Sequence, residues 1–199
     1  MCGIICCGPN TSFSQEDLKK SMMFISKRGP DYNTCIEMKD SGFWVAITQL
    51  MIVGKDNQPI LYENLAIQGN IEIYTYKSIF KDYFNKQDIK EDKFSDIRII
   101  LPLYKRMLTL GFSEEKAFYE VLKIIKEDFS FIIFDNKGNI IITRDSVGIR
   151  PLYYAIQDDN KWGFSSVVES LLSLGFTENN IKSVPPGTYL FSKISELPF

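Results

Sequence analysis

The sequence predicts a mixed α+β fold, and three features of its 199 residues support this class. An apolar run at residues 3–7 is typical of a buried strand, and two segments near the middle repeat apolar residues at helical spacing. After them comes the strongest hairpin signal in the sequence, followed by further short strands. Because strands and helices come in groups, a layered α+β structure is favoured over a parallel doubly wound sheet.

The first half of the sequence is expected to contain mainly strands. Ser14 has the position of a helix cap, and apolar residues at helical spacing follow it until Arg28, Gly29 and Pro30. Short strands are expected at 43–47, 50–53, 65–68 and 71–74. Residues 54–59 are expected to form a loop, and the charged segment 77–93 is expected to be exposed.

The second half is expected to contain two helices and then a second group of strands. Residues 99–110 have helical periodicity, and Ser113 is expected to cap a helix that reaches about Lys126. Residues 136–138 separate the two strands of the hairpin at 129–143. The remaining expected elements are strands at 152–156, 162–165 and 188–191 and a short helix at 167–174.

Composition excludes several classes of function. The net charge is −2 and no basic run stands out, so nucleic-acid binding is not expected. No apolar stretch is long enough to cross a bilayer, and the first residues lack the basic region of a signal peptide. We therefore expect a cytoplasmic protein without membrane contact.

The cysteines and the absence of histidine limit the chemistry. Cys2, Cys6 and Cys7 are too crowded for a disulfide framework, so they and Cys35 are expected to be reduced thiols. A zinc site built from the four would lack the usual pair of C-x-x-C knuckles, and no metal site is expected. The sequence has no histidine, so any nucleophile must use another base.

Cys2 directly follows the initiator methionine, and this position has a chemical meaning. A residue as small as cysteine generally permits removal of Met1, which would give Cys2 both a thiol and a free α-amino group. That amine has a reference pKa of about 7.7–8.0, so it can serve as the general base for its own thiol. On position alone, the plainer interpretation is that Cys2 is an incidental small residue.

Short motifs follow one another along nearly the whole sequence. They are M-C-G-I at 1–4, R-G-P-D at 28–31, Q-P at 58–59, S-D at 95–96, F-S-F at 129–131, R-D-S-V-G-I-R-P-L-Y-Y at 144–154, F-S-S at 164–166 and P-P-G at 185–187. In this order they resemble the motifs of class II glutamine amidotransferase domains of the asparagine synthetase type. The run at 144–154 is the most specific of them.

The resemblance implies an N-terminal nucleophile hydrolase fold, an αββα four-layer sandwich with two antiparallel sheets. This domain would cover residues 1–192, with 193–199 as a tail or the start of a linker. Cys2 would attack the side-chain amide of glutamine, and water would cleave the resulting thioester to give glutamate after ammonia has left. Arg28 would lie near Cys2, and Asp96 would bind the α-amino group of glutamine. Arg28, Asn70 and Glu72 are also expected to bind the substrate, and residues 144–154 would be structural.

The first departure from the family concerns the oxyanion hole. The family motif N-G-E-I-Y supplies an Asn side chain and a Gly backbone N–H, and its best match keeps Asn70 and Glu72 but has Ile71 in place of Gly. A β-branched residue would be strained if this position requires a positive φ. Losing one oxyanion donor can cost about 10²–10³ in rate. A second register aligns Gln68 and Gly69 with N-G but loses the Glu and the Tyr.

The second departure concerns the substrate carboxylate. In the family an Arg clamps the α-carboxylate of glutamine, and the matching residue is Gln49. A neutral amide can donate a hydrogen bond but lacks the bidentate, charge-assisted pairing of Arg. Affinity for free glutamine should therefore be weaker, or the substrate should differ. A third departure is Val167, where the family has Glu.

Three hypotheses remain open. In the first, the protein is a glutaminase that needs no cofactor of its own and delivers ammonia to an ATP-dependent synthetase, as a fragment or as a separate subunit. In the second, it is a non-catalytic regulatory or interaction domain, and in the third it hydrolyses another amide. Cys2, Arg28 and Asp96 favour the first, whereas Gln49 and Ile71 favour the others. The sequence is compatible with an oligomer and does not specify one.

Overall fold

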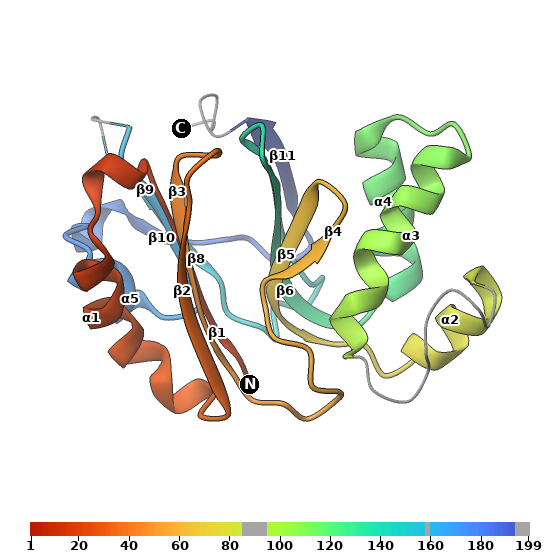
Figure 1. Ribbon diagram of the computed structural model, residues 1–199, viewed down its shortest axis with the longest axis horizontal. Helices are drawn as coiled ribbons and strands as arrows, with labels where there is room; N and C mark the ends of the chain where they lie inside the picture. Colours follow the sequence, from red (N-terminus) through yellow and green to blue (C-terminus); the bar gives the residue numbers. More distant parts are fainter. Residues whose placement is uncertain (85–94, 158–159, 194–199) are drawn as a thin grey trace.

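In the computed structural model, two antiparallel sheets pack face to face and helices cover both outer faces (Figure 1). The structure describes residues 1–84, 95–157 and 160–193. In spatial order, the first sheet contains β10 (Ile181–Ser183), β8 (Tyr153–Ile156), β9 (Trp162–Ser165), β1 (Gly3–Gly8), β3 (Phe43–Gln49) and β2 (Tyr32–Met38). The second contains β11 (Tyr189–Lys193), β7 (Asn139–Arg144), β6 (Asp128–Asp135), β5 (Leu65–Glu72) and β4 (Ile60–Tyr62).

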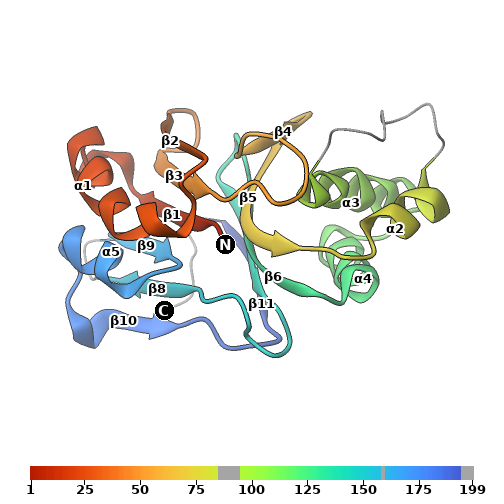
Figure 2. The same ribbon diagram turned by 90° about the horizontal axis from the view of Figure 1, so that it is seen from below.

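The helices form the two outer layers, as Figure 2 shows from below. Helices α1 (Gln15–Ile25) and α5 (Val168–Ser173) cover the first sheet. Helices α2 (Tyr76–Tyr83), α3 (Ile100–Thr109) and α4 (Glu114–Ile125) cover the second. The expected αββα sandwich with two antiparallel sheets is therefore confirmed.

The central strands read as continuous apolar runs because both of their faces are covered. In β1, Ile4 and Cys6 face the core between the sheets, whereas Ile5 and Cys7 face helices α1 and α5. Side chains alternate along a strand, so a strand buried on both faces is apolar at most of its positions. The hairpin of β6 and β7 is also mainly apolar, with Ser130 and Thr143 among its buried polar exceptions, and occurs as predicted.

Local signals at the helix ends are partly confirmed. Ser14 and Asp17 form a complete capping box at the start of α1, which satisfies otherwise unpaired backbone N–H groups. Ser113 has the expected cap position before α4, but its side chain makes no capping hydrogen bond; its carbonyl accepts from the N–H of Ala117 at 2.7 Å.

Several strand predictions were wrong or incomplete. Residues 50–53 form no strand; they follow β3 as a loop, and the N–H of Met51 donates to the Asp31 carboxylate at 2.8 Å. The predicted break at Gly69 and Asn70 does not exist, because β5 runs without interruption from Leu65 to Glu72 in register with β6.

The strands β2, β4 and β10 were not predicted, and all three lie at or next to sheet edges. The charged segment 77–93 was predicted to be exposed, but its described part lies mainly in α2, where Ile79 and Phe80 are buried. Residues 85–93 of this segment and residues 194–199 of the predicted tail lie outside the described residues. Within the described part of the protein, no helix has both the length and the apolar character needed to cross a membrane.

Candidate active site

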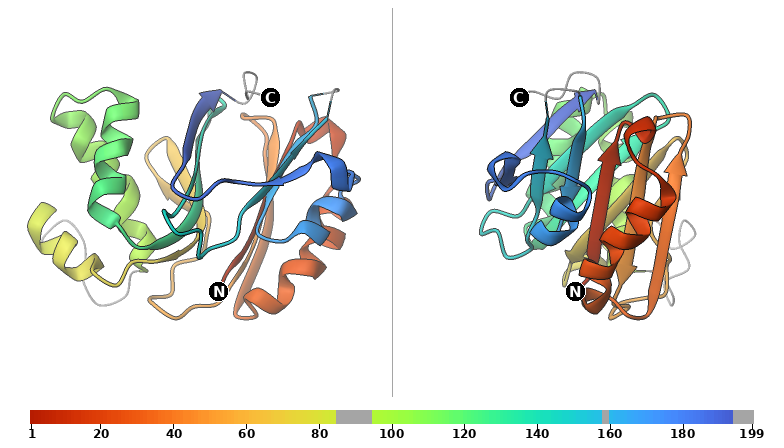
Figure 3. Two further views of the ribbon diagram at one scale, coloured as in Figure 1. Left: turned by 180° about the vertical axis from the view of Figure 1, so that it is seen from behind. Right: turned by 90° about the vertical axis from the view of Figure 1, so that its left-hand side faces the viewer.

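Cys2 directly precedes β1, at the edge where the two sheets approach each other, and the view from behind shows the N-terminus at the same place (Figure 3). An open cleft at this edge encloses about 550 Å³, part of it open to solvent. Six of the seven predicted site residues line it: Cys2, Gln49, Asn70, Ile71, Glu72 and Asp96. The β3–β4 loop forms another part of the wall, and Met1 also lies in the cleft.

The seventh predicted residue, Arg28, lies beside the nucleophile and outside the cleft wall. Its Nε donates to the backbone carbonyl of Cys2 at 3.0 Å, which fixes the backbone at the first residues of β1. Burial lowers the pKa of Arg28 from its ordinary value, but the residue stays cationic at neutral pH.

Cys2 is nearly enclosed, with 9% of its surface exposed. Burial raises the pKa of the Cys2 thiol, and the hydrogen bond to Leu50 and the positive charges of the N-terminus and Arg28 only partly oppose that effect. The thiol is therefore protonated at neutral pH, and a nucleophilic attack requires a base that removes its proton.

Asn70 lies on β5 directly across from Cys2. Its Oδ1 accepts a hydrogen bond from the backbone nitrogen of Cys2 at 3.1 Å, so the side-chain amide is oriented by the nucleophile's own backbone. The Nδ2 of Asn70 is buried and has no hydrogen-bond partner among the described residues. A buried donor without a partner costs free energy unless a ligand or water accepts from it.

The next residue, Ile71, continues the strand opposite Phe129, and its φ is not positive. The strain that a β-branched residue would suffer in the left-handed region therefore does not arise.

The alternative register, with Gln68 and Gly69, is less compatible with the site. Gln68 is fully buried, and its Nε2 donates to the carbonyl of Ile5 at 2.9 Å, away from the cleft. The backbone N–H of Gly69 donates to the Oε1 of Gln58 at 2.7 Å. Asn70 is therefore the amide that faces the nucleophile.

Gln49 fastens the loop that forms one side of the cleft. Its Nε2 donates to the carbonyl of Asp56 at 3.0 Å, and its Oε1 accepts from the N–H of Gln58 at 2.7 Å. The residue is 4% exposed. Its role in substrate binding stays a prediction, and the structure gives it a second role in holding residues 56–58.

Asp96 lies at the entry to α3 and is held by backbone groups. Its two oxygens accept from the N–H groups of Ile73 at 2.7 Å and Ile97 at 3.0 Å. Burial raises its pKa to about 6, because those hydrogen bonds and one from its own N–H only partly compensate for the loss of water, and the charge of Glu72 adds to the rise. No ion pair to Asp96 occurs among the described residues, so its charge is only partly neutralised.

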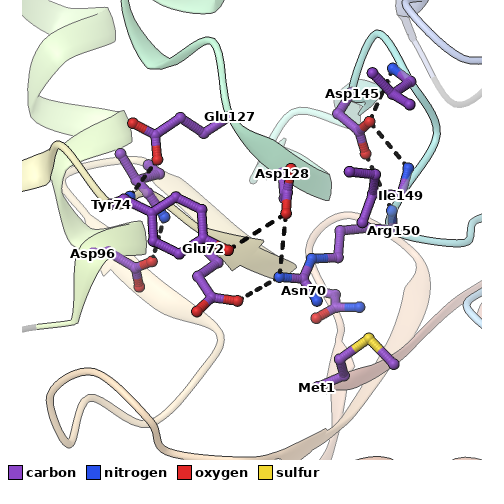
Figure 4. Close-up of polar contacts among 12 residues, drawn as sticks. Met1, Asn70, Glu72, Tyr74, Asp96, Glu127, Asp128, Asp145, Ile149 and Arg150 are labelled. Carbon is purple, nitrogen blue, oxygen red and sulfur yellow. Dashed lines mark hydrogen bonds and ion pairs between the residues drawn. The ribbon is translucent and has the colours of Figure 1, made fainter.

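Glu72 and Arg150 form the charged side of the cleft (Figure 4). The Nη2 of Arg150 pairs with Glu72 and lies 3.8 Å from the Asp128 carboxylate. Arg150 belongs to the run at 144–154, which the sequence indicated to be structural, yet it lines the cleft. Its buried Nε has no partner among the described residues.

The rest of the 144–154 run is structural, as expected. The carboxylate of Asp145 accepts from the backbone N–H groups of residues 147–150, at distances of 2.6 to 3.1 Å. Arg144 donates in turn to the carbonyls of Gly148, Arg150 and Val184. Gly148 has φ +75°, and a Cβ there would lie 2.7 Å from Pro186, so only glycine fits this turn.

Three cleft residues were missed as functional candidates: Asp56, Gln58 and Arg150. Asp56 accepts from the N–H of Ser95 at 2.7 Å and pairs with Arg98 at 3.2 Å, so it joins the loop to the start of the helical segment. Gln58 belongs to the Q-P motif, which was the available signal. The role of Arg150 depends on Glu72, which is 78 positions away in the sequence.

The cysteines do not assemble into one cluster. Cys6 and Cys7 point to opposite faces of β1, since neighbouring residues on a strand alternate. All four thiols are free, and no group of three His, Cys, Asp or Glu residues in the described ranges could hold a metal ion.

Comparisons with known proteins agree with this geometry. A family profile described as "Glutamine amidotransferase domain" matches residues 1–199. The protein is 27% identical to a probable glutamine-hydrolysing asparagine synthetase of Acanthamoeba polyphaga mimivirus, over 100% of its own length and 35% of that protein. It is 26% identical to the glutamine-hydrolysing asparagine synthetase B of Escherichia coli strain K12, over 91% of its own length and 31% of that protein.

Among solved structures, the glutamine phosphoribosylpyrophosphate amidotransferase of B. subtilis, complexed with ADP and GMP, superposes with a TM-score of 0.77. The match covers 96% of this protein and 47% of that one at 16% identity, which shows a shared fold. The present sequence spans about a third of the length of the two synthetases.

Proposed function

The protein belongs to the class II glutamine amidotransferase domain family and has the N-terminal nucleophile hydrolase fold, and from this premise we propose that it hydrolyses the side-chain amide of glutamine with Cys2 as the nucleophile. The observation that carries the proposal is the pairing of Cys2 with Asn70 across the cleft. It brings together a thiol, the nitrogen of the same residue and an amide donor without a partner among the described residues.

Removal of Met1 would turn the backbone nitrogen of Cys2 into a free amine. That nitrogen lies 3.1 Å from the Oδ1 of Asn70, which would position the amine by accepting a hydrogen bond from it. The neutral amine takes the proton of the thiol, whose pKa is raised by burial. Removal of Met1 also clears part of the cleft, because Met1 is one of its lining residues.

The reaction then proceeds through an oxyanion. The sulfur of Cys2 bonds to the amide carbon, and the oxyanion is stabilised by the Nδ2 of Asn70 and the backbone N–H of Ile71. The protonated amine gives its proton to the leaving nitrogen, the C–N bond breaks, and ammonia departs. Water then cleaves the thioester and returns the thiol.

Substrate recognition depends on the acidic end of the cleft. Asp96 and Glu72 attract the α-ammonium group of glutamine, and Asp96 is the stronger candidate because Glu72 is already paired with Arg150. Arg28 holds the backbone of Cys2 in place, and its predicted part in substrate binding stays a prediction.

The ammonia would pass to an ATP-dependent domain or subunit of the asparagine synthetase type. Relatives named as glutamine-hydrolysing asparagine synthetases support this inference, since the present sequence matches about a third of each. The hydrolysis itself needs no cofactor in this domain. A free thiol nucleophile is in keeping with a reducing, cytoplasmic environment.

The test is ammonia and glutamate release from glutamine by protein that lacks Met1. Cys2→Ala should abolish release, whereas Cys35→Ala should retain it, because Cys35 is a half-buried thiol on β2 that does not line the cleft. Asn70→Ala should lower kcat by about 10²–10³. Release that persists in Cys2→Ala would contradict the proposal, and no release by the processed wild type with a synthetase present would favour a non-catalytic domain.

A further inference from the structure

The charges around the cleft are unevenly matched. Among the described residues that line it, Asp56, Glu72 and Asp96 contribute carboxylates, and Arg150 contributes the one cationic side chain. Arg150 is already paired with Glu72 and also faces Asp128. The described part of the cleft therefore offers an incompletely neutralised carboxylate, that of Asp96. Its one cationic side chain, Arg150, is already engaged through Nη2, although its buried Nε has no partner among the described residues.

The position of Gln49 does not supply the missing cation. Its nitrogen donates to one backbone carbonyl and its oxygen accepts from one backbone N–H, both in residues 56–58. The surroundings of this amide are rich in oxygen, because the carbonyl it binds belongs to Asp56, whose carboxylate also lines the cleft. A free carboxylate placed here would lie beside the Asp56 carboxylate, and the nearby guanidinium of Arg98 is already paired with Asp56 at 3.2 Å.

Arg28 does not fill this role either. Its Nε is bonded to the carbonyl of Cys2, so the guanidinium lies at the nucleophile's end of the site. The α-carbon of a bound glutamine lies at the other end, because its amide carbon must reach the sulfur of Cys2. The α-ammonium group can there meet Asp96, whereas a free α-carboxylate meets no unpaired cationic side chain among the described residues that line the cleft.

We propose that the cleft selects glutamine whose α-carboxyl group is neutral, such as the N-terminal glutaminyl residue of a peptide or another α-amide, over free glutamine. This inference rests on the proposed function, since it names the substrate class of the same site. The reaction balances without a further reactant: water is consumed, the C–N bond of the glutaminyl δ-amide breaks, and glutaminyl becomes glutamyl with release of ammonia.

The rim of the cleft fits a substrate that continues beyond its α-carbonyl. Met51, Ile52 and Val53 also line the cleft, and Ile52 is 65% exposed. An apolar rim gives the next group of a peptide or amide a surface to pack against, and a free amino acid ends before it reaches such a surface.

The direct test compares kcat/KM of the processed wild type for L-glutamine and for its α-N-methylamide, which can release ammonia only from its δ-amide. The methylamide should be at least about 10-fold better, as expected when an unmatched charge is removed from the substrate. Equal values, or a preference for free glutamine, would overturn the inference and leave the proposed function intact. Absence of ammonia from both substrates would overturn the proposed function itself.

Two further measurements make the result specific to charge. The N-acetylated methylamide, which lacks the ammonium group, should lose at least about 10-fold relative to the methylamide; undiminished turnover would contradict recognition by Asp96. Gln49→Arg should shift the ratio of the two kcat/KM values toward free glutamine by about 10-fold. The matched variant Gln49→Met breaks the same loop contacts without adding charge and should leave the ratio unchanged, with melting curves confirming that both variants fold.

Discussion

Asp145 and Asp96 are both almost completely buried carboxylates that accept hydrogen bonds from backbone N–H groups, yet their environments differ. Asp145 receives four such bonds from residues 147–150, which outweigh the effect of burial and hold its pKa below the ordinary value. Asp96 receives too few to compensate for burial, and its pKa rises to about 6. One carboxylate is satisfied by the fold, and the other is left with unsatisfied charge in a cleft.

The difference separates a structural carboxylate from one suited to a ligand. The carboxylate of Asp145 is fully hydrogen-bonded within the protein, so it stabilises a turn and is not available to bind a substrate. A buried carboxylate whose charge the protein does not fully compensate destabilises the folded state when it is ionised. Binding of a cationic ligand to that carboxylate restores the lost stability. We therefore expect substitutions at Asp145 to affect folding and substitutions at Asp96 to affect substrate binding.

The largest expected effect is on folding. Asp145→Ala should lower the free energy of unfolding by about 3–5 kcal/mol, because four backbone N–H groups, one buried and three partly buried, lose an ionised acceptor at once. Denaturant unfolding at pH 7 measures this change. A loss below about 1 kcal/mol would mean that the turn at 146–150 does not depend on this carboxylate.

Asp96→Asn should impair substrate binding and leave stability nearly unchanged, the reverse of Asp145→Ala. Its kcat/KM should fall by about 10- to 100-fold, since the α-ammonium group loses an ionic partner. Its free energy of unfolding should stay within about 1 kcal/mol of the wild type, because removing a charge that is costly to bury offsets the weakened hydrogen bonds. A large loss of stability with normal kinetics would reverse the assignment of the two residues.

The smaller effect is the pH dependence of substrate binding. The pKa of Asp96 is about 6, so the carboxylate loses its charge as the pH falls through that value. KM should fall by up to about 10-fold as the pH rises from about 5 to about 7, and this change should be absent in Asp96→Asn.

The contribution of Asp96 to the free energy of unfolding should decrease over the same pH interval in which substrate binding improves. The pKa of Asp96 is raised from about 3.9 in the unfolded chain to about 6 in the folded protein. Its contribution to the free energy of unfolding is therefore greatest below about pH 3.9 and is lost as the pH rises through about 6. The unfolding free energy of the wild type relative to Asp96→Asn should therefore decrease between about pH 4 and about pH 7. An unchanged difference would show that Asp96 titrates alike in both states.

Most strands buried on both faces could be predicted from the sequence, whereas three of the four edge strands could not; the edge strand β11 was predicted, and the internal strand β5 was predicted with a false break. Strands such as β1 and β6 are largely apolar runs, and the turn between β6 and β7 is a strong local signal. The edge strand β2 is only partly buried and carries polar residues, so its pattern is weak. Residues 50–53 have the composition of a strand but serve as the apolar rim of the cleft.

Site residues could be predicted where a single sequence motif specifies both the residue type and its place in the fold. Cys2, Asn70 and Asp96 each stand in a recognisable motif, and all three line the cleft. Arg150 was missed because its environment is created by pairing with Glu72, and Gln49 acquired its loop contacts through residues 56–58. Such pairings follow from the packing of the two sheets, which no local pattern specifies.

In the proposed mechanism, Cys2 acts with its own amine as the base. The most direct measurement is ammonia release by two otherwise identical proteins, one that starts at Cys2 and one that keeps Met1, with intact mass confirming each. We predict release only by the protein that starts at Cys2, because only there is the nitrogen beside Asn70 a free amine. Equal release by both proteins would contradict this mechanism.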